Sequence, residues 1–329
     1  MQITLVGHDQ PVPVQAGDTV LASLLRAGLA FPFSCQAGNC GTCKCELVSG
    51  DIHELEYSEH ALSPAERARG IVLACRAQVW DDTVIRRIDA EELVVHPSRV
   101  MRCRVLELEA LTHDIRSVRL AIEAGGPFTF SAGQYAQLEF APGLSRHYSM
   151  ASTPEEPELV FHVRHMPGGR TSAYVATELK IGDRVKVSGP LGIAYLRDAH
   201  RGPVLLVAGG SGLAPIQSIL GTLLGRGHDD PVTLYFGVRS ERDLYHEALL
   251  KDLAARHANF RYHVVLSEQK GASGRRYGLV HEAIEVPAPE DTMAYLAGPP
   301  VMVEAATALL ASRGLQQRQI HADAFYNQS

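Results

Sequence analysis

The stretch CQAGNCGTCKC, residues 35–45, holds four of the six cysteines in this 329-residue chain. Structural disulfides are a poor explanation for this crowding. The N-terminal sequence MQITLVGHDQ lacks the basic start and the apolar run of a secretory signal peptide, and disulfides are rare in proteins that are not exported. Clustered cysteines in such a chain indicate metal ligands or redox groups.

The spacing of the cysteines distinguishes between kinds of metal site. Cys35, Cys40 and Cys43 form the pattern C-x4-C-x2-C, and Cys75 follows after a long gap. This is the plant-type pattern, in which four thiolates hold the two irons of a [2Fe–2S] cluster. A zinc site would require a second C-x-x-C pair or histidine ligands, and the second pair is missing. The four cysteines are therefore predicted to be cluster ligands.

The other residues of this stretch fit the same interpretation. Gly38 and Gly41 allow the backbone to curl tightly, so that its N–H groups can point at sulfur. Cys45 begins a run that reads as a strand, and Cys103 lies in the apolar pattern VMRCRVLEL. Because cysteines outside disulfides are among the most often buried residues, both thiols are predicted to pack as small apolar side chains.

Composition limits the function classes. The net charge of −6 disfavours a nucleic-acid binder, and the chain has no uninterrupted run of about 18 apolar residues that could span a membrane. Residues 1–95 contain 13 acidic and 7 basic side chains, whereas the remainder contains equal numbers of each. The acidic surplus therefore belongs to the cysteine-bearing segment. Since the chain shows neither a signal peptide nor a membrane-spanning run, a cytoplasmic location is expected.

Length and patterning divide the chain into three predicted domains. The first, residues 1–92, fits a small mixed sheet crossed by one helix. Asp18 is expected to cap that helix and Gly28 to end it. Its strands are expected at residues 2–7, 11–16, 45–50 and 71–79. Residues 90–99, which include the chain-breaking Pro97, are predicted to be the linker.

The second predicted domain, residues 99–200, is rich in strands. These strands are expected at residues 101–111, 115–122, 135–140, 158–165 and 184–190, with the RHYSMAS segment described below as a further strand. Short strands at this spacing, separated by Gly and Pro, indicate an antiparallel barrel or sandwich. One short helix is expected at residues 171–179.

The third predicted domain, residues 201–329, alternates strands with helices. The strands are expected at residues 203–208, 232–238, 261–267 and 293–298, and the helices at 215–224, 243–257 and 301–314. This alternation indicates a doubly wound parallel sheet. The strand ends of such sheets bind nucleotides.

Two turns at the ends of these strands are candidate nucleotide contacts. GGSGLAP, residues 209–215, follows the first strand and opens a helix, so a phosphate could approach its glycines and the helix N-terminus. Its spacing is not that of the standard G-x-G-x-x-G sequence, so a plain strand-to-helix turn is the alternative. AGPP, residues 297–300, ends the last clear strand at the ligand-binding edge, and an ordinary proline turn is the alternative.

RHYSMAS, residues 146–152, lies on a predicted barrel strand. Arg146 and Tyr148 are two residues apart and therefore share one face of the strand. Arginine pairs with phosphate, and tyrosine offers a flat stacking surface. A half-exposed strand without a ligand is the alternative.

Together, the cysteine pattern, the two strand-end turns and the RHYSMAS strand resemble the flavoprotein reductases of bacterial aromatic-ring hydroxylating oxygenases, in the ferredoxin–NADP reductase superfamily. The resemblance is strongest to the reductase components of naphthalene-type dioxygenases, and it covers the whole chain. It implies a β-grasp [2Fe–2S] ferredoxin domain, an antiparallel β-barrel that binds FAD and a doubly wound parallel-sheet domain that binds NADH. The segments THDIRSV (112–118), GPLGIAYL (189–196) and HADAFY (321–326) also resemble this subgroup.

The resemblance implies roles at the flavin. The family motif R-x-Y-S-x-x-S matches Arg146, Tyr148, Ser149 and Ser152. By this likeness Arg146 meets the FAD pyrophosphate, Tyr148 stacks on the isoalloxazine and Ser149 hydrogen-bonds near N5. A second flavin segment matches Gly169, Arg170, Thr171 and Ser172. Phe325 is expected to cover the flavin until nicotinamide displaces it, and a core aromatic is the alternative.

The resemblance also implies nucleotide contacts. The residues expected to make them are Gly209, Gly210, Gly212, Arg239, Ser267, Glu268, Gly298, Pro299 and Met302. Ala297 stands where related proteins often have a cysteine, so a thiol contribution to hydride transfer is not expected. NADP enzymes carry Ser-Arg where this chain has Ser267-Glu268, and a carboxylate there would repel a 2′-phosphate and suits NADH. Arg275 and Arg276 are nearby and could offset this repulsion.

The implied reaction passes electrons from NADH through FAD and the cluster to a ferredoxin or directly to a Rieske-type oxygenase, with the cofactors carrying the chemistry. Reductases that serve a deoxysugar dehydrase or a di-iron monooxygenase share the architecture and are alternatives. Outside the enzymes, the alternatives are an electron-carrier module with a regulatory nucleotide domain and a cluster-based redox sensor. The aromatic substrate does not contact this chain in any of these schemes.

Overall fold

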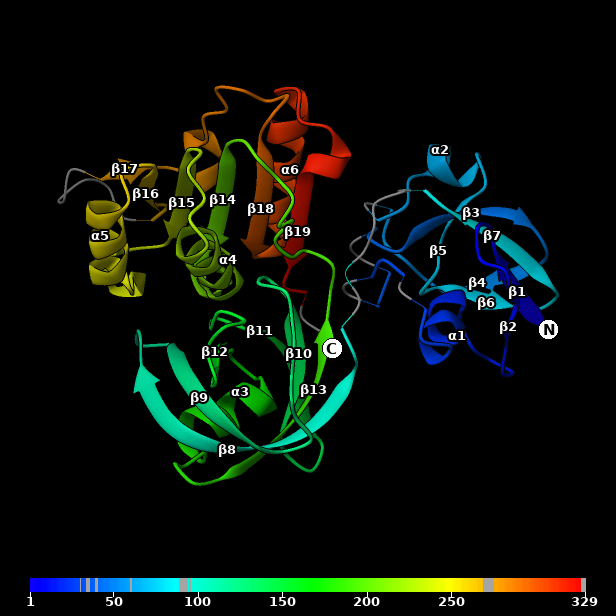
Figure 1. Ribbon diagram of the computed structural model, residues 1–329, viewed down its shortest axis with the longest axis horizontal. Helices are drawn as coiled ribbons and strands as arrows, with labels where there is room; N and C mark the ends of the chain where they lie inside the picture. The colour runs from blue at the N-terminus through cyan, green and yellow to red at the C-terminus, as the bar shows by residue number, and fades with distance from the viewer. Residues whose placement is uncertain are drawn as a thin grey trace. The chain divides into compact units, whose positions relative to one another are not determined.

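The structure is a computed structural model that describes residues 1–29, 31–33, 36–38, 41–59, 61–88, 94, 96–268 and 275–326. These residues form two compact units, one within Met1–Val95 and the other within His96–Asn327 (Figure 1). The predicted cluster ligands Cys35 and Cys40 lie outside the described residues, as do residues 90–93 of the predicted linker.

The first unit is built on a mixed five-stranded sheet, as predicted. Its strands, in spatial order, are β2 (Val12–Pro13), β1 (Gln2–Leu5), β7 (Thr83–Arg87), β3 (Lys44–Ser49) and β5 (Ile71–Leu73). The β1–β7 pair is parallel and the other pairs are antiparallel. The unit also contains α1 (Val20–Arg26), α2 (Pro64–Arg67) and a two-stranded sheet of β4 (Ile52–Glu54) and β6 (Ala77–Val79).

Two local predictions for this unit are wrong. Thr19, and not Asp18, caps α1, because its hydroxyl accepts a hydrogen bond from the N–H of Ala22 at 3.2 Å. Asp18 instead pairs with Arg26 in the last turn of the helix. Residues 71–79 form two strands and not one, because the chain turns at Cys75 between β5 and β6. The predicted end of the helix is confirmed by a glycine with positive φ just after it.

The second unit begins with a six-stranded antiparallel sheet that nearly closes into a barrel. Its spatial order is β11 (Leu144–Ser149), β10 (Tyr135–Ala141), β13 (Arg184–Leu191), β8 (Arg99–Ala110), β9 (Ile115–Ala124) and β12 (Leu159–Arg164). A bridge between Met150 and Phe161 brings the two edges together. The interior includes Cys103, which is buried as predicted. Helix α3 (Arg170–Thr177) confirms the expected short helix.

The rest of this unit is a parallel sheet in the order β17 (Arg276–Tyr277), β16 (Phe260–Leu266), β15 (Val232–Val238), β14 (Val204–Gly209), β18 (Met293–Gly298) and β19 (Ile320–Ala324). Helices cover both faces of it (Figure 1). Leu206 packs with α4 (Leu213–Gly225) on one face, whereas Leu205 and Val207 pack with α6 (Pro300–Ser312) on the other. The predicted doubly wound sheet is confirmed, and β14 and β18 mark the point where the strand order reverses.

One helix of this sheet is shorter than predicted. Helix α5 begins at Glu247 and ends at Arg256, four residues after the predicted start at Asp243. His246, directly before it, has a left-handed φ of 55°, and the Asp243 carboxylate accepts hydrogen bonds from the N–H and hydroxyl of Ser240. Asp243 instead ends a short 3-10 helix, Glu241–Asp243, which is separated from α5 by residues 244–246. Among the described residues, no helix is long and apolar enough to cross a membrane.

Candidate functional site

Glycines allow the ends of β14 and β18 to approach each other closely. A Cβ at Gly212 would lie 2.1 Å from the carbonyl oxygen of Ala297, and one at Gly298 would lie 2.9 Å from that of Gly209. A Cβ at Gly209 would lie 2.5 Å from the sulfur of Met302. Two of the predicted nucleotide-binding glycines, Gly212 and Gly298, are therefore required by the protein's own backbone packing, at the place where doubly wound sheets bind ligands.

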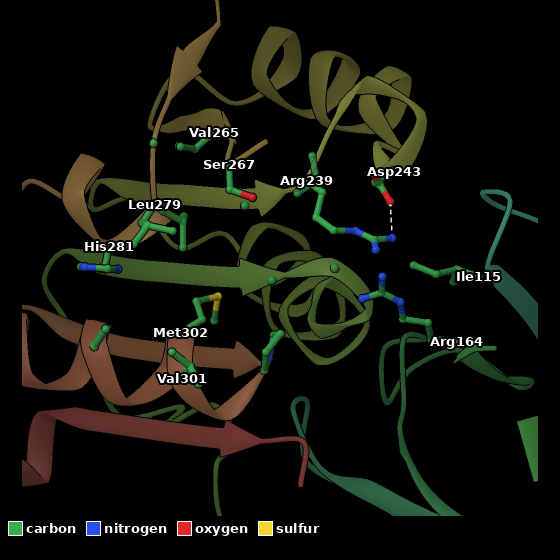
Figure 2. Close-up of a pocket in the computed structure, with 18 of the residues that line it drawn as sticks. Ile115, Arg164, Arg239, Asp243, Val265, Ser267, Leu279, His281, Val301 and Met302 are labelled. Carbon is green, nitrogen blue, oxygen red and sulfur yellow. Dashed lines mark hydrogen bonds and ion pairs between the residues drawn. The ribbon is translucent and has the colours of Figure 1, made fainter. Parts of the chain in front are cut away.

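A cavity of about 310 Å³ opens at these strand ends (Figure 2). Its apolar part includes Val265, Leu279 and Val301, and its polar part includes two arginines and two aspartates. Six residues predicted from the sequence line it, namely Gly209, Gly210, Arg239, Ser267, Pro299 and Met302. The predicted Gly212, Glu268 and Gly298 are not among its lining residues. An elongated cavity with one charged end fits a ligand that has both flat and anionic parts.

Carboxylates compensate the arginines near the end of β16. The N–H of Glu268 donates to the carbonyl of Arg239 at 2.9 Å, which keeps Glu268 beside the end of β15. Arg275 pairs with Glu241 at 2.9 Å and with Glu247 at 3.0 Å. Arg276 lies 3.3 Å from the Glu285 carboxylate and donates to a backbone carbonyl. The two arginines that could offset the Glu268 charge are thus already paired.

The RHYSMAS strand forms the barrel edge as β11. Tyr148 packs edge-on against Phe140, with ring centres 6.0 Å apart. Burial raises the pKa of the Tyr148 hydroxyl to about 12, so that it stays neutral. Arg146, two residues earlier, is exposed. The strand therefore offers a flat neutral ring and a cation, the pair of groups that suits a phosphate-bearing aromatic cofactor.

The start of α3 adds a set of N–H donors near β11 and β12. Gly169 is its N-cap, and a Cβ there would lie 2.7 Å from the Ser172 hydroxyl. That hydroxyl accepts from the N–H of Met166 at 3.0 Å and donates to the carbonyl of Gly169 at 3.1 Å. Thr171 is buried, whereas Arg170 is exposed at the first helical position. This combination of a helix N-terminus and an arginine favours an anionic group.

Ser149, the last residue of β11, connects the barrel to β19. Its hydroxyl donates a hydrogen bond to the Asp323 carboxylate at 3.0 Å, and both side chains are buried. Burial raises the pKa of Asp323 to about 6, although the hydrogen bond from Ser149 partly opposes this rise. A carboxyl group that titrates within the usual assay range therefore lies beside a predicted flavin contact.

Two of the predicted cluster ligands are buried. Cys43 and Cys75 are 3% and 5% exposed, and the N–H of Ala74 donates to the carbonyl of Cys43 at 2.9 Å. Gly38 and Gly41 have φ values of 75° and 71°, which side chains rarely adopt. The glycines therefore allow the tight turns that bring buried thiols together, which fits a cluster held by thiolates.

Cys45 differs from these two cysteines. It is 0% exposed within β3 and pairs in the sheet with Val72 and Arg87. Burial, together with the nearby Cys75, raises the pKa of its thiol to about 12. The interpretation of Cys45 as a small buried side chain within a strand is therefore confirmed.

Comparison with known proteins identifies the three parts of the chain. Family models match a 2Fe-2S iron-sulfur cluster binding domain over residues 3–79, an oxidoreductase FAD-binding domain over 102–195 and an oxidoreductase NAD-binding domain over 206–308. The reductase component of the naphthalene 1,2-dioxygenase/salicylate 5-hydroxylase systems of Ralstonia is 43% identical, over 95% of this chain and 94% of that protein. The ferredoxin–NAD(P)⁺ reductase component of the Pseudomonas putida naphthalene 1,2-dioxygenase system is 40% identical over 99% of both chains. This chain belongs to the ferredoxin–NAD(P)⁺ reductase component family.

A solved structure supports the same assignment. The cytochrome P450 reductase GcoB of Amycolatopsis is 37% identical, with a TM-score of 0.84 over 100% of this chain and 99% of that one. Membership of the reductase family confirms the resemblance, the three fold types and the [2Fe–2S], FAD and NAD cofactors.

Two other predicted flavin residues of this reductase have structural contacts. The Ser152 hydroxyl accepts from the N–H of Val160 at 3.2 Å, and its carbonyl accepts from the Ser218 hydroxyl of α4 at 2.7 Å. Phe325 is half-buried against the core of the parallel sheet, and its N–H donates to the carbonyl of Gly298 at 2.9 Å. Their roles at the flavin stay predictions.

Three charged residues, Asp114, Arg164 and Asp323, are among those of the reductase site that were not predicted from the sequence. Asp114 and Arg164 line the cavity although both belong to the barrel, and Asp323 contacts Ser149. Asp114 and Asp323 lie in THDIRSV and HADAFY, which resemble the subgroup as segments but have no spacing rule that indicates a role. Arg164 is the last residue of β12, a strand that contains no recognisable motif.

Proposed function

We propose that this chain is the NADH-dependent reductase component of an aromatic-ring dioxygenase system. It passes electrons through FAD and a [2Fe–2S] cluster to a ferredoxin or directly to a Rieske-type oxygenase. The observation that carries the proposal is the end-to-end similarity to reductases of naphthalene dioxygenase systems, which spans 99% of this chain in one case. A cytoplasmic location is part of the proposal, because NADH is a coenzyme of the cell interior.

Separate groups of residues would hold the cofactors. Tyr148 would stack on the flavin ring, while Arg146 and the N-terminus of α3 would bind its pyrophosphate. Cys35, Cys40, Cys43 and Cys75 would hold the cluster. When bound, the flavin accepts two electrons from NADH and releases them one at a time to the cluster. Ser149, held by Asp323, would present its hydroxyl toward the flavin ring.

The proposal includes a preference for NADH over NADPH. The Glu268 carboxylate would repel a 2′-phosphate, and Arg275 and Arg276 are paired with carboxylates of their own. Glu268→Arg should raise kcat/KM for NADPH relative to NADH by about tenfold, the scale of one charge-assisted hydrogen bond. Glu290→Arg, which reverses the charge of an exposed glutamate outside the cavity lining, serves as the control. Equal kcat/KM for the two nucleotides in the parent protein would contradict the preference.

The function is tested with the purified protein loaded with FAD and iron. Under anaerobic conditions, NADH should bleach the flavin absorbance first and the cluster absorbance afterwards. The protein should then support naphthalene oxidation by a purified Rieske-type oxygenase, assayed with and without a separate small ferredoxin. Absence of flavin bleaching would reject the reductase function. Bleaching without support of any aromatic-ring oxygenase would place the acceptor in another class, such as a di-iron monooxygenase.

A further inference from the structure

Two guanidinium groups face each other at the charged end of the cavity (Figure 2). Arg239 follows β15 of the parallel sheet, whereas Arg164 ends β12 of the barrel. Like charges at short distance repel each other, and a partly buried site screens the repulsion less than bulk water does. An anion is needed between them to keep this arrangement.

Asp114, in the turn between β8 and β9, is that anion. Its Oδ2 accepts a hydrogen bond from Arg164 Nε at 2.9 Å and one from Arg239 Nη2 at 3.3 Å. The side chain is only 17% exposed. One carboxylate oxygen therefore connects an arginine of the barrel to an arginine of the parallel-sheet part.

The Asp114 carboxylate is itself fixed in place. Its other oxygen, Oδ1, accepts from the Thr112 hydroxyl at 2.9 Å, and that hydroxyl accepts from the N–H groups of Asp114 and Ile115. The carbonyl of Asp114 accepts from the N–H of His165, the residue after Arg164, at 2.7 Å. The anion is thus held by the backbone on both sides of it, which is the condition for positioning a partner accurately.

Asp114 leaves part of each guanidinium facing the cavity. It binds Arg164 through Nε, while Arg164 Nη1 lies only 3.2 Å from where a Cβ of Gly210 would be, over the turn that opens toward α4. Arg239 uses the same nitrogen, Nη2, for Asp114 and for Asp243, which lies 2.7 Å away. Since arginine has five N–H donors, both residues keep donors for a further anion.

We propose that Asp114 is a positioning residue for nucleotide binding. It holds Arg164 of the barrel against Arg239, so that both guanidiniums present N–H groups to the phosphates of a nucleotide in this cavity, and it does not contact the nucleotide itself. This inference rests on the proposed function, because it requires NADH to bind here. The opposite arrangement, in which the carboxylate competes with phosphate for the arginines, predicts an effect of opposite direction.

The test is stopped-flow reduction of the bound flavin at increasing NADH concentration, with parent protein and Asp114→Asn. Asparagine keeps the shape but removes the charge. We expect the Kd for NADH to rise about tenfold, the usual scale for a hydrogen bond between charged groups, while the limiting rate of flavin reduction changes less than about threefold. Asp114→Glu, which restores the charge on a longer side chain, should recover part of the affinity.

A matched control is available on the outer surface of the barrel. Glu123 also lies among arginines, with Arg104 at 2.9 Å and Arg102 at 3.7 Å, but it does not line the cavity. Glu123→Gln should leave the Kd for NADH unchanged. If both substitutions weaken binding equally, the effect is a general loss of barrel stability and the proposal is wrong.

A double-mutant cycle separates positioning from a merely structural role. In an Arg164→Gln background, Asp114→Asn should weaken NADH binding by much less than tenfold, because its partner is already missing. Additive effects, an unchanged Kd or tighter binding by Asp114→Asn would each overturn the proposal. If the parent protein bleaches with NADH while Asp114→Asn behaves identically, the reductase function stands and only this inference fails.

Discussion

The cysteine loop and the nucleotide cavity collect their functional groups from very different lengths of chain. The predicted cluster ligands all lie between residues 35 and 75. The pairing of β3 with β5 and a backbone hydrogen bond from Ala74 to Cys43 join two of the segments that carry them. The cavity instead combines residues from Asp114 to Ala305, from two sheets that each have their own core. We therefore expect changes in the loop to abolish one step outright, and changes around the cavity to shift affinities gradually.

The largest expected effect is that of Cys43→Ser. Loss of one of four thiolates should remove the [2Fe–2S] absorbance and reduce NADH-dependent cytochrome c reduction to background, while ferricyanide reduction from the flavin persists. Cys45→Ser is the matched control two residues away, and it should keep the cluster because Cys45 lies outside the C-x4-C-x2-C pattern and packs within β3. Iron content and visible spectra of both variants decide the point. Iron loss in Cys45→Ser with retention in Cys43→Ser would invert the assignment.

The predicted flavin site is intermediate between the cysteine loop and the nucleotide cavity. Its first motif lies within the single strand β11, but its second segment comes from the start of α3. Arg146→Ala and Tyr148→Ala should each weaken FAD binding by about tenfold, through loss of one phosphate contact or one stacking surface. Equilibrium titration of apoprotein with FAD measures this. Arg184→Ala, an exposed arginine on β13, is the control. If neither variant loses affinity, β11 is only a structural strand.

Asp323→Asn tests a contact that joins residues 174 positions apart. The pKa of Asp323 in the folded protein is about 6 and its ordinary value is about 3.9, so ionisation opposes folding. The free energy of unfolding of the parent should therefore fall as pH rises from about 4 to about 6, by at most about 3 kcal/mol, and stay lower above that range. Asparagine does not ionise, so Asp323→Asn avoids this loss of stability.

Unfolding of the parent and Asp323→Asn proteins is compared at pH 5 and pH 8. The variant should have the higher Tm at pH 8, by a few degrees, and the difference should narrow at pH 5. Effects of other titrating groups cancel in this comparison. A constant difference at both pH values would show that Asp323 is not charged at the higher one.

The smallest expected effect concerns the acidic surface of the first unit. Glu56 and Glu59 are exposed, whereas Glu54 is paired with Arg67 at 2.9 Å and is less available to a partner. Replacing Glu56 and Glu59 with Gln should lower electron delivery to the natural acceptor about twofold at low salt and flatten its salt dependence. Ferricyanide reduction is the control and should not change. Equal rates at low and high salt in the parent would mean that charge does not steer docking.

The sequence predicts the fold well where the signal is periodic. Nearly all the longer strands of the barrel and the parallel sheet lie where alternation and apolar runs place them. The errors occur at helix starts, where neighbouring side chains compete for the same local hydrogen bonds. Thr19 caps α1 in place of Asp18 because its hydroxyl accepts a hydrogen bond from an N–H of the first turn. Helix α5 starts later than predicted because the Asp243 carboxylate accepts hydrogen bonds from Ser240 and belongs to the preceding 3-10 helix.

The candidate site residues also divide into those whose place was expected from the sequence and those whose role depends on contacts between distant segments. Gly209, Arg239 and Met302, which the family resemblance implies as nucleotide contacts, line the cavity. The sequence could not show that Gly212 and Gly298 serve the contact between two strands, because that contact joins segments far apart in the chain. It also left open whether Arg275 could accept a 2′-phosphate, and the pairing of Arg275 with Glu241 and Glu247 supports the proposed preference for NADH.

By itself, the sequence determined the order of the three parts, and it predicted the cluster ligands and the flavin strand, because each depends on spacing within a few tens of residues. Only the tertiary structure decided which charges meet. Asp114 lies between Arg164 and Arg239, and Asp323 lies beside Ser149, because the barrel and the parallel sheet pack together. Ion pairs and buried hydrogen bonds act over a few ångströms. Their partners are therefore set by the path of the folded chain, which local sequence patterns do not contain.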